Sequence, residues 1–229
     1  MSNYKELRDR AFNGTKPKLS FEILAANPHL VYHPAVNPAT SSAHYTIYNE
    51  NSAVCCTAEE AMLLYRITEF LNPEIVIEVG SYAGWSTAHI LAALRPDHEL
   101  IAVDNFSECN NPDLVKSVIS QVLYYYQNNS SLYEQNSTEF LEACQAKANM
   151  IFIDGFHRDG KPLQDVKAAM NCLTSNGILI LHDVWMPDVA IASNWLINER
   201  GFNSHMFETD NYLTVYSRGD LSWCQTITL

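Results

Sequence analysis

The sequence predicts an α/β fold in which a mostly parallel β-sheet is flanked by helices. Short apolar runs rich in β-branched residues alternate along the chain with stretches of helical periodicity. One of these runs, Ile75–Val79, leads into a turn with two glycines and then into a helical pattern that begins at about Trp85. Near the C-terminus two strand-like segments follow one another, which indicates a final hairpin. At 229 residues the chain is long enough for one large domain.

Composition excludes several classes of protein. The net charge of -12 and the pI of about 5.0 argue against a nucleic-acid backbone or an anionic membrane as the main partner. No uncharged apolar run reaches the roughly 18 residues of a membrane span. The N-terminal segment MSNYKELRDRAF lacks the apolar core of a signal peptide, so a cytoplasmic protein with reduced thiols is expected. The six cysteines show no metal-binding spacing.

Residues 1–56 are predicted to form an N-terminal extension to a domain of residues 57–229. Short helices are expected at Asn3–Phe12 and Leu19–Ala26. The segment from Asn27 to Ser52 is expected to be irregular, because prolines and asparagines cluster in it. It is too long for a simple connector. It is interpreted either as a strap on the core, as a contact between the subunits of a homodimer, or as a lid over a substrate cleft.

A helix is predicted to lead into the first central strand. Thr57 and Glu60 have the spacing of a capping box, and Asn72 with Pro73 ends the helix. Between them apolar residues recur at helical spacing, at Ala61, Leu64, Ile67 and Leu71.

The turn after this strand is the predicted ligand site. In open α/β sheets ligands bind where strand ends meet a helix N-terminus. Gly80 and Gly84 allow unusual backbone dihedrals and let a ligand approach closely. Tyr82 stands where the second glycine of the dinucleotide fingerprint G-x-G-x-x-G would be, so an NAD(P) oxidoreductase is disfavoured. The alternative interpretation is an ordinary strand–turn–helix with a buried acid, Glu78.

The remaining elements follow in order. Helices are predicted at Trp85–Leu94, Pro112–Gln127, Thr138–Cys144, Pro162–Leu173 and Asp188–Glu199, and strands at Leu100–Val103, around Leu132, and at Met150–Ile153, Ile178–Leu181, Phe202–Glu208 and Tyr212–Tyr216. Asn176 and Gly177 are expected to form the turn that precedes the strand Ile178–Leu181.

Acidic residues stand where three of the predicted strands end. Asp104 can accept hydrogen bonds from the two vicinal hydroxyls of a ribose. If the strands that precede them are neighbours in the sheet, the strand ends at Asp154 and Asp183 lie about 4.8 Å apart, where two carboxylates bind a cation or share a proton. His157, on the turn after Asp154, is expected to face the same crevice. His182 would point to the opposite face from Asp183 in a regular strand, so a structural or supporting role is expected for it.

The pattern E-x-G-x-x-x-G in residues 78–84 resembles motif I of class I S-adenosylmethionine (SAM) methyltransferases. The segments FIDGFH (152–157) and NGILILHD (176–183) resemble the small-molecule O-methyltransferases grouped with catechol O-methyltransferase and the macrolide-sugar O-methyltransferases, of the methyltransferase family 24 type. The similarity covers roughly residues 57 to 217. It implies a Rossmann-like sheet of seven strands with a C-terminal antiparallel hairpin.

The resemblance also implies a set of cofactor-binding residues. The glycine loop would wrap the methionine end of SAM, and Asp104 would bind the ribose. Phe106 would pack on the adenine, and Asn136 or Ser137 would contact it; a helix N-cap is the alternative role of Ser137. The implied SAM-binding residues are Glu78, Gly80, Ser81, Tyr82, Gly84, Ser86, Asp104, Asn105, Phe106, Asn136, Ser137 and Asp154.

On the acceptor side, the resemblance implies that Asp154 and Asp183 hold Mg²⁺ or another divalent cation and that His157 is the general base. Val184 stands where catechol-type enzymes carry a further amide ligand. The expected function is methylation of a hydroxyl on a small natural product or sugar-like molecule, with Trp185 and Met186 as a wall of the acceptor site. The alternatives are N- or C-methylation without a metal, and a SAM-binding or degenerate module in an assembly.

Overall fold

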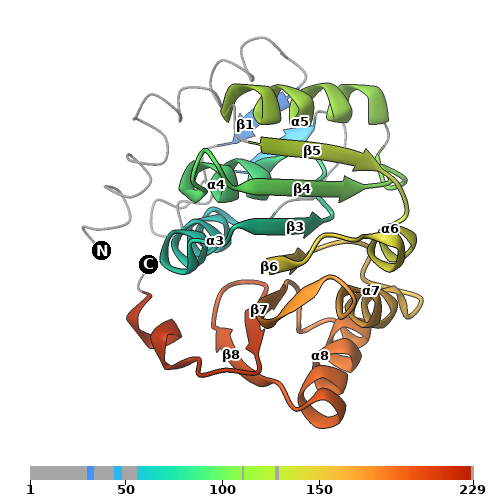
Figure 1. Ribbon diagram of the computed structural model, residues 1–229. Helices are drawn as coiled ribbons and strands as arrows, with labels where there is room; N and C mark the ends of the chain where they lie inside the picture. The colour runs from blue at the N-terminus through green and yellow to red at the C-terminus, as the bar shows by residue number, and fades with distance from the viewer. Residues whose placement is uncertain (1–29, 34–43, 48–55, 110, 127–128, 228–229) are drawn as a thin grey trace.

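The computed structural model describes residues 30–33, 44–47, 56–109, 111–126 and 129–227. A seven-stranded sheet crosses the molecule with helices on both faces (Figure 1), and its strand order is β5-β4-β3-β6-β7-β9-β8. The strands are β3 (Ile75–Val79), β4 (Glu99–Asp104), β5 (Asn129–Glu134), β6 (Ala148–Ile153), β7 (Leu173–Leu181), β8 (Asn203–Phe207) and β9 (Leu213–Ser217). The first five strands of this order are parallel, and β9 and β8 run antiparallel. The predicted fold class is therefore confirmed.

Within the described residues, three helices pack on each face of the sheet. The helices α3 (Ala58–Leu71), α4 (Trp85–Ala93) and α5 (Pro112–Tyr126) cover one face, and α6 (Ser137–Ala143), α7 (Lys161–Ala169) and α8 (Pro187–Arg200) cover the other. Because successive strand side chains point to opposite faces, Val76 belongs to the first core and Ile77 to the second. A short 3₁₀ turn, η1 (Ser222–Thr226), follows β9.

The predicted start and end of α3 are confirmed. The Thr57 hydroxyl accepts a hydrogen bond from the Glu60 N–H at 3.2 Å, and the Glu60 carboxylate accepts one from the Thr57 N–H at 2.7 Å. Asn72, in the left-handed conformation with φ 46°, ends the helix just before Pro73. Both ends of α3 are therefore fixed, and the chain continues from Asn72 into β3.

Part of the predicted extension forms a separate pair of strands. The strands β1 (Leu30–His33) and β2 (His44–Ile47) pair antiparallel, so the expectation of a wholly irregular segment was wrong. Their Val, Tyr, Thr and Ile residues favour extended backbone, which the count of prolines had outweighed. The helices expected at 3–12 and 19–26 lie outside the described residues, and the strap, lid and dimer interpretations stay predictions.

Strand β7 is longer than expected. It begins at Leu173, and the preceding helix α7 ends at Ala169. Asn176 and Gly177, for which a turn had been predicted, therefore lie within the strand. The β6–β7 pairing shifts register between Ala148 and Met150, and such an irregularity absorbs the extra residues.

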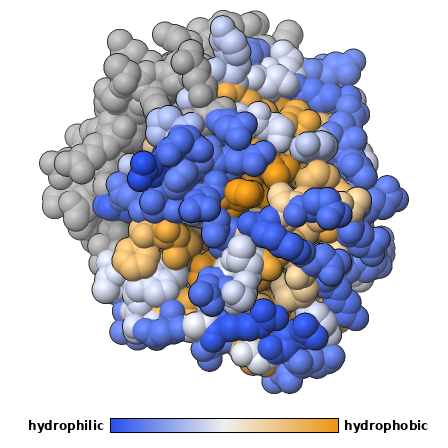
Figure 2. All heavy atoms as spheres, viewed as in Figure 1, coloured by the Kyte–Doolittle hydropathy of each residue, from blue (hydrophilic) through white to orange (hydrophobic). Residues whose placement is uncertain are grey.

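The parallel strands bring their carboxyl ends to one edge of the sheet. Strand β4 lies on one side of β3 and β6 on the other, which makes a crevice of the kind that binds ligands in open α/β sheets. On the surface seen in Figure 2, hydrophilic residues cover most of the described part and apolar residues fill smaller areas between them. Among the described residues no helix combines the length and apolar character that a bilayer crossing requires.

Candidate functional site

A cavity of about 510 Å³ opens at the carboxyl edge of the sheet. Its walls include residues that follow four neighbouring strands: Gly80 after β3, Asp104 at the end of β4, Asp154 after β6, and His182 with Asp183 after β7. Residues far apart in the chain therefore meet there, as the strand-end pattern predicts.

The two glycines of the turn after β3 are needed by the protein itself. Both have positive φ, +85° at Gly80 and +83° at Gly84. A Cβ on Gly80 would lie 2.1 Å from the carbonyl oxygen of Asp154, and one on Gly84 would lie 3.3 Å from side-chain atoms of Ile119 and Val122 on α5. Gly80 borders the cavity, whereas Gly84 packs away from it. The missing Cβ atoms thus make room for protein backbone and side chains, where room for a ligand had been expected.

Glu78 lies beneath the turn rather than on the cavity wall. Its side chain is fully buried and accepts hydrogen bonds from the hydroxyls of Ser86 at 2.5 Å and Thr87 at 2.6 Å. Burial raises the pKa of Glu78 to about 7, the two hydroxyls oppose that shift, and the nearby carboxylates of Asp154 and Asp104 add to it. Glu78 and Ser86 therefore tie the end of β3 to the first turn of α4. Ser81 is likewise buried, off the cavity lining.

Asp104 fixes the loops on either side of it. Its carboxylate accepts the backbone N–H of Tyr82 at 2.8 Å and that of Phe106 at 2.6 Å. Burial raises the pKa of Asp104, although these two hydrogen bonds oppose the shift. Tyr82, Asp104 and Asn105 all line the cavity.

Phe106, expected to pack on the adenine, does not line the cavity. Its backbone is left-handed with φ 54°, and its ring is buried in the core shared with α5. The loop residues that do reach the cavity after Asn105 are Ser107, Glu108 and Cys109.

At the start of α6 the roles of two neighbouring residues differ from expectation. Asn136, not Ser137, is the N-cap, because its side chain accepts the N–H of Thr138 at 3.1 Å. Ser137 lines the cavity and donates its hydroxyl to the buried carboxylate of Asp165 at 2.9 Å. Lys161, which the sequence analysis did not single out, also lines the cavity and contacts the side chains of Asn136 and Asp165.

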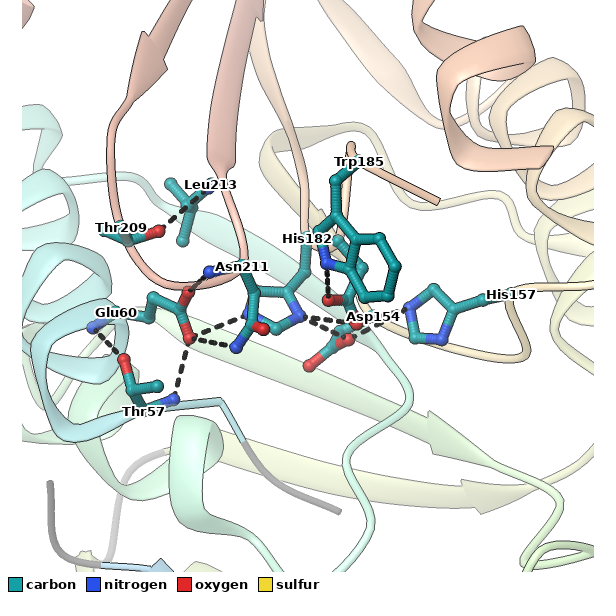
Figure 3. Close-up of polar contacts among 10 residues, drawn as sticks. Thr57, Glu60, Asp154, His157, His182, Trp185, Thr209, Asn211 and Leu213 are labelled. Atoms are coloured by element: carbon teal, nitrogen blue, oxygen red, sulfur yellow. Dashed lines mark hydrogen bonds and ion pairs between the residues drawn. The ribbon is translucent and has the colours of Figure 1, made fainter. Parts of the chain in front are cut away.

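Two aspartates and two histidines form one cluster in the cavity. A ligand atom from each of Asp154, His157, His182 and Asp183 lies within 4.8 Å of the others. Nε2 of His157 lies 3.3 Å from Oδ1 of Asp154 and 3.4 Å from Oδ2 of Asp183. Nδ1 of His182 lies 3.0 and 3.2 Å from the same two oxygens (Figure 3). Each imidazole therefore contacts both carboxylates.

The expectation that His182 points away from Asp183 was wrong. Strand β7 ends at Leu181, and Asp183 has a left-handed backbone with φ 55°, so the alternation of a regular strand stops before these residues. Val184, at the position expected for an amide ligand, packs against the second core. The additional polar member of the cluster is thus His182, which precedes Asp183.

Glu60 is a member of this site that the sequence analysis missed. Its carboxylate Oε2 lies 2.9 Å from Nε2 of His182, on the far side of the ring from the aspartates (Figure 3). Burial by itself would raise the pKa of Glu60, but His182 and the Thr57 N–H outweigh it and lower the pKa to about 2. In the sequence its position is fully explained by the capping box, so no local signal points to a second role.

The cluster carries compensating charges. Burial opposes ionisation of Asp154, yet His182 and His157 lower its pKa to about 2. Burial alone would lower the pKa of His182, but Asp154, Asp183 and Glu60 raise it well above its ordinary value. Carboxylate oxygens and imidazole nitrogens are the donor atoms that divalent metals use in proteins, and four such groups converge here. The residues therefore fit a divalent cation.

Aromatic side chains border the cluster. The Trp185 indole N–H donates to Oδ1 of Asp183 at 2.9 Å. Trp185 is 58% exposed and Phe156 40% exposed, and both line the cavity together with Met186. The predicted wall formed by Trp185 and Met186 thus lies beside the acids, with Phe156 as an additional member.

Comparison with known families agrees with this geometry. A family model described as a methyltransferase domain matches residues 77–184. Catechol O-methyltransferase B of Danio rerio is 26% identical over 160 residues, which are 66% of this chain and 58% of that protein. The match thus spans less than two thirds of the curated relative's length.

Solved structures share the fold at low sequence identity. Cofactor-bound Rv0187 from MTB aligns with a TM-score of 0.69 at 12% identity, over 94% of this chain and 96% of that one. The O-methyltransferase TomG of Streptomyces achromogenes, solved with SAM, aligns with a TM-score of 0.62 at 13% identity, over 73% and 83% of the two chains. At these identities the likeness concerns the fold alone.

Proposed function

Because a family model described as a methyltransferase domain matches residues 77–184, we propose that the chain is a class I, SAM-dependent enzyme that transfers the methyl group of SAM to a hydroxyl oxygen of a small molecule. The observation that carries the proposal is that the cluster of Asp154, His157, His182 and Asp183 shares one cavity with the glycine turn after β3. The proposed donor site and a group of side chains suited to activating an acceptor would thus lie side by side.

The cofactor half is assigned to the β3 and β4 ends of the cavity. Gly80 and Tyr82 would border the methionine part of SAM, and Asp104 would accept hydrogen bonds from the ribose hydroxyls. Asn105 and Ser137 would approach the adenine from the following loops. Glu78 and Ser86 support this half from below, because they hold the turn in place without lining the cavity.

The acceptor half is assigned to the β6 and β7 ends. Asp154 and Asp183 would hold a divalent cation, and their proximity to two imidazoles supports that assignment. Such a cation lowers the pKa of a hydroxyl bound to it. His157, which lines the cavity and has Nε2 beside both carboxylates, would take the proton of the hydroxyl, since an imidazole suits that task near neutral pH. Holding the oxygen in line with the methyl group supplies much of the rate.

The rim suggests which acceptors fit. Trp185, Phe156 and Met186 offer apolar and aromatic surface next to polar Asp183. An acceptor with an apolar face and a hydroxyl at its edge would fit both the aromatic surface and Asp183. Natural products, with or without an attached sugar, have this character. A cytoplasmic location and assembly as a homodimer are parts of the same proposal, and residues 1–56 are proposed to form a strap, a lid or the contact between subunits.

The test is an activity screen with labelled SAM. Phenolic and sugar hydroxyl acceptors are incubated with the chain and Mg²⁺ or Mn²⁺, with and without chelator, and S-adenosylhomocysteine is measured. Asp154→Ala should abolish turnover, whereas Asp113→Asn, an exposed acid on α5, should leave it unchanged. Full activity in chelator would remove the cation from the scheme. Turnover confined to amine or carbon acceptors would favour the alternative methylations, and SAM binding without any turnover would favour a binding module.

A further inference from the structure

We propose that Glu60 is a positioning residue that orients His182, so that Nδ1 of His182 joins Asp154 and Asp183 as a ligand of the divalent cation. The inference rests on the proposed metal site. It adds one ligand and one supporting carboxylate to that site, and neither belongs to the ligand set that the sequence resemblance implies.

The ring of His182 is held from both sides. Nε2 lies 2.9 Å from Glu60, and Nδ1 lies 3.0 Å from Asp154 (Figure 3). The side chain is 4% exposed, and the Phe152 ring packs edge-on against the imidazole. The imidazole therefore has one orientation in which one nitrogen faces the acids of the cavity and the other faces Glu60.

Glu60 itself has a fixed position. Oε1 accepts the Asn211 N–H at 2.9 Å, and Oε2 accepts the Thr57 N–H at 2.7 Å and the Asn211 side-chain amide at 3.3 Å. The side chain is fully buried at the start of α3. A carboxylate that several donors hold on two segments can restrain an imidazole ring more firmly than a mobile surface acid.

This arrangement has a known chemical use. Histidines that bind metals through one ring nitrogen donate the other N–H to a carboxylate, which sets the tautomer and the ring orientation. In a metal-bound state, a proton kept on Nε2 beside Glu60 would leave Nδ1 of His182 free to bind the cation between Asp154 and Asp183. In the described part of the chain both ion pairs of His157 involve Nε2, and none involves Nδ1, so His157 remains the better candidate for moving a proton.

The inference reaches beyond the residues that the family comparison matches. Glu60 lies before residues 77–184 and Asn211 after them, yet Asn211 holds the carboxylate of Glu60 that contacts His182. The start of α3 and the connection between β8 and β9 would therefore be parts of the metal site, as well as of the fold.

The test measures metal affinity directly, with Mn²⁺ as the probe, by electron paramagnetic resonance of the free ion in the presence of S-adenosylhomocysteine. Glu60→Gln should weaken Mn²⁺ binding about 10- to 100-fold, the usual effect of removing such a carboxylate, with unchanged affinity for S-adenosylhomocysteine. Thr57→Ala is the matched control, because it removes the other half of the capping box and keeps the Glu60–His182 contact. It should lower the melting temperature and leave Mn²⁺ affinity unchanged.

A double-mutant cycle isolates the pair. In a His182→Ala background, Glu60→Gln should cause no further loss of Mn²⁺ affinity. If Glu60→Gln does not fold, Glu60→Asp serves instead, because its shorter side chain should show the same loss. Equal Mn²⁺ affinity in Glu60→Gln and the wild type, or an equal loss in Thr57→Ala, would overturn the positioning role alone. A wild-type chain that binds no Mn²⁺ would overturn the proposed metal site, and this inference with it.

Discussion

The turn at Gly80 rests directly on the backbone of Asp154: a Cβ on Gly80 would lie 2.1 Å from the Asp154 carbonyl oxygen. The Gly80 N–H also donates to the carbonyl of Val103 at 2.9 Å, and the Asp154 N–H donates to that of Val79 at 2.9 Å. The proposed cofactor loop and the first acid of the proposed acceptor site are thus joined through backbone. A substitution at Gly80 should therefore also displace Asp154.

Gly80→Ala should strongly destabilise the protein. The left-handed conformation costs roughly 1–2 kcal/mol for a residue with a Cβ, and overpacking adds typically about 1–3 kcal/mol. Gly201→Ala, at φ +68° with nothing within 4 Å of the added atom, is the matched control that carries only the conformational cost. The free energy of unfolding in urea should fall by about 3 kcal/mol or more for Gly80→Ala, given those terms, and clearly less for Gly201→Ala. Equal losses in the two variants would contradict the contact with Asp154.

Glu78→Gln should change how stability depends on pH. The pKa of Glu78 is about 7 in the folded protein against an ordinary 4.5, so the unfolded chain releases its proton first. Stability therefore falls as pH rises from about 4.5 to 7, by on the order of 3 kcal/mol at 1.36 kcal/mol per pKa unit. Glutamine cannot ionise, so the variant should be less affected over this range, and its stability relative to wild type should rise with pH.

Urea unfolding at pH 5 and pH 8 measures this difference. Glu74→Gln, an exposed glutamate just before β3, is the control. A wild-type-minus-variant difference that stays constant between the two pH values would mean that Glu78 is not held in the protonated form.

Asp104→Asn should weaken cofactor binding. The carboxylate accepts two backbone N–H groups, and an amide would turn an NH₂ group toward one of them and loosen that loop. Hydrogen bonds to charged groups contribute roughly 1.5–3 kcal/mol, which corresponds to a loss of about 10- to 100-fold in affinity. Calorimetric titration with S-adenosylhomocysteine measures it, and the exposed Asp97→Asn serves as control. Unchanged affinity would remove Asp104 from the cofactor site.

Trp185→Ala should raise the KM for the acceptor about tenfold, because a buried aromatic contact contributes roughly 0.5–1.5 kcal/mol beyond its area. Trp185→Phe should keep most of the affinity, since the ring remains while the N–H to Asp183 is lost. Ile191→Ala, an exposed apolar residue on α8, should leave KM unchanged. Steady-state kinetics decide the question, and equal KM values in all three variants would place the acceptor elsewhere in the cavity.

Local patterns in the sequence were sufficient to predict most strands of the sheet. Strand β3 was predicted with its observed bounds, Ile75–Val79, because a β-branched apolar run bounded by turn residues is by itself a signal for a buried strand. The capping box of Thr57 and Glu60 was equally local. The acids at strand ends were found because the carboxyl ends of parallel strands must share one edge.

For other residues, a single backbone dihedral angle decided where the side chain lies. Positive φ turns Phe106 into the core and ends the alternation at Asp183, so that His182 and Asp183 reach the same cluster. A side-chain pattern of period two does not record such a reversal at one residue, because it assumes a regular strand.

The sequence by itself therefore determined the succession of strands and helices along the chain, because that depends on short-range periodicity. It also determined that the acids follow strand ends and so gather at one edge of the sheet. The tertiary structure alone decided that Glu60 contacts His182 and Asn211, the latter 151 positions along the chain. It also decided that Gly80 lies against Asp154. Contacts of this range depend on how helices and loops pack against the sheet, and no local rule of spacing specifies them.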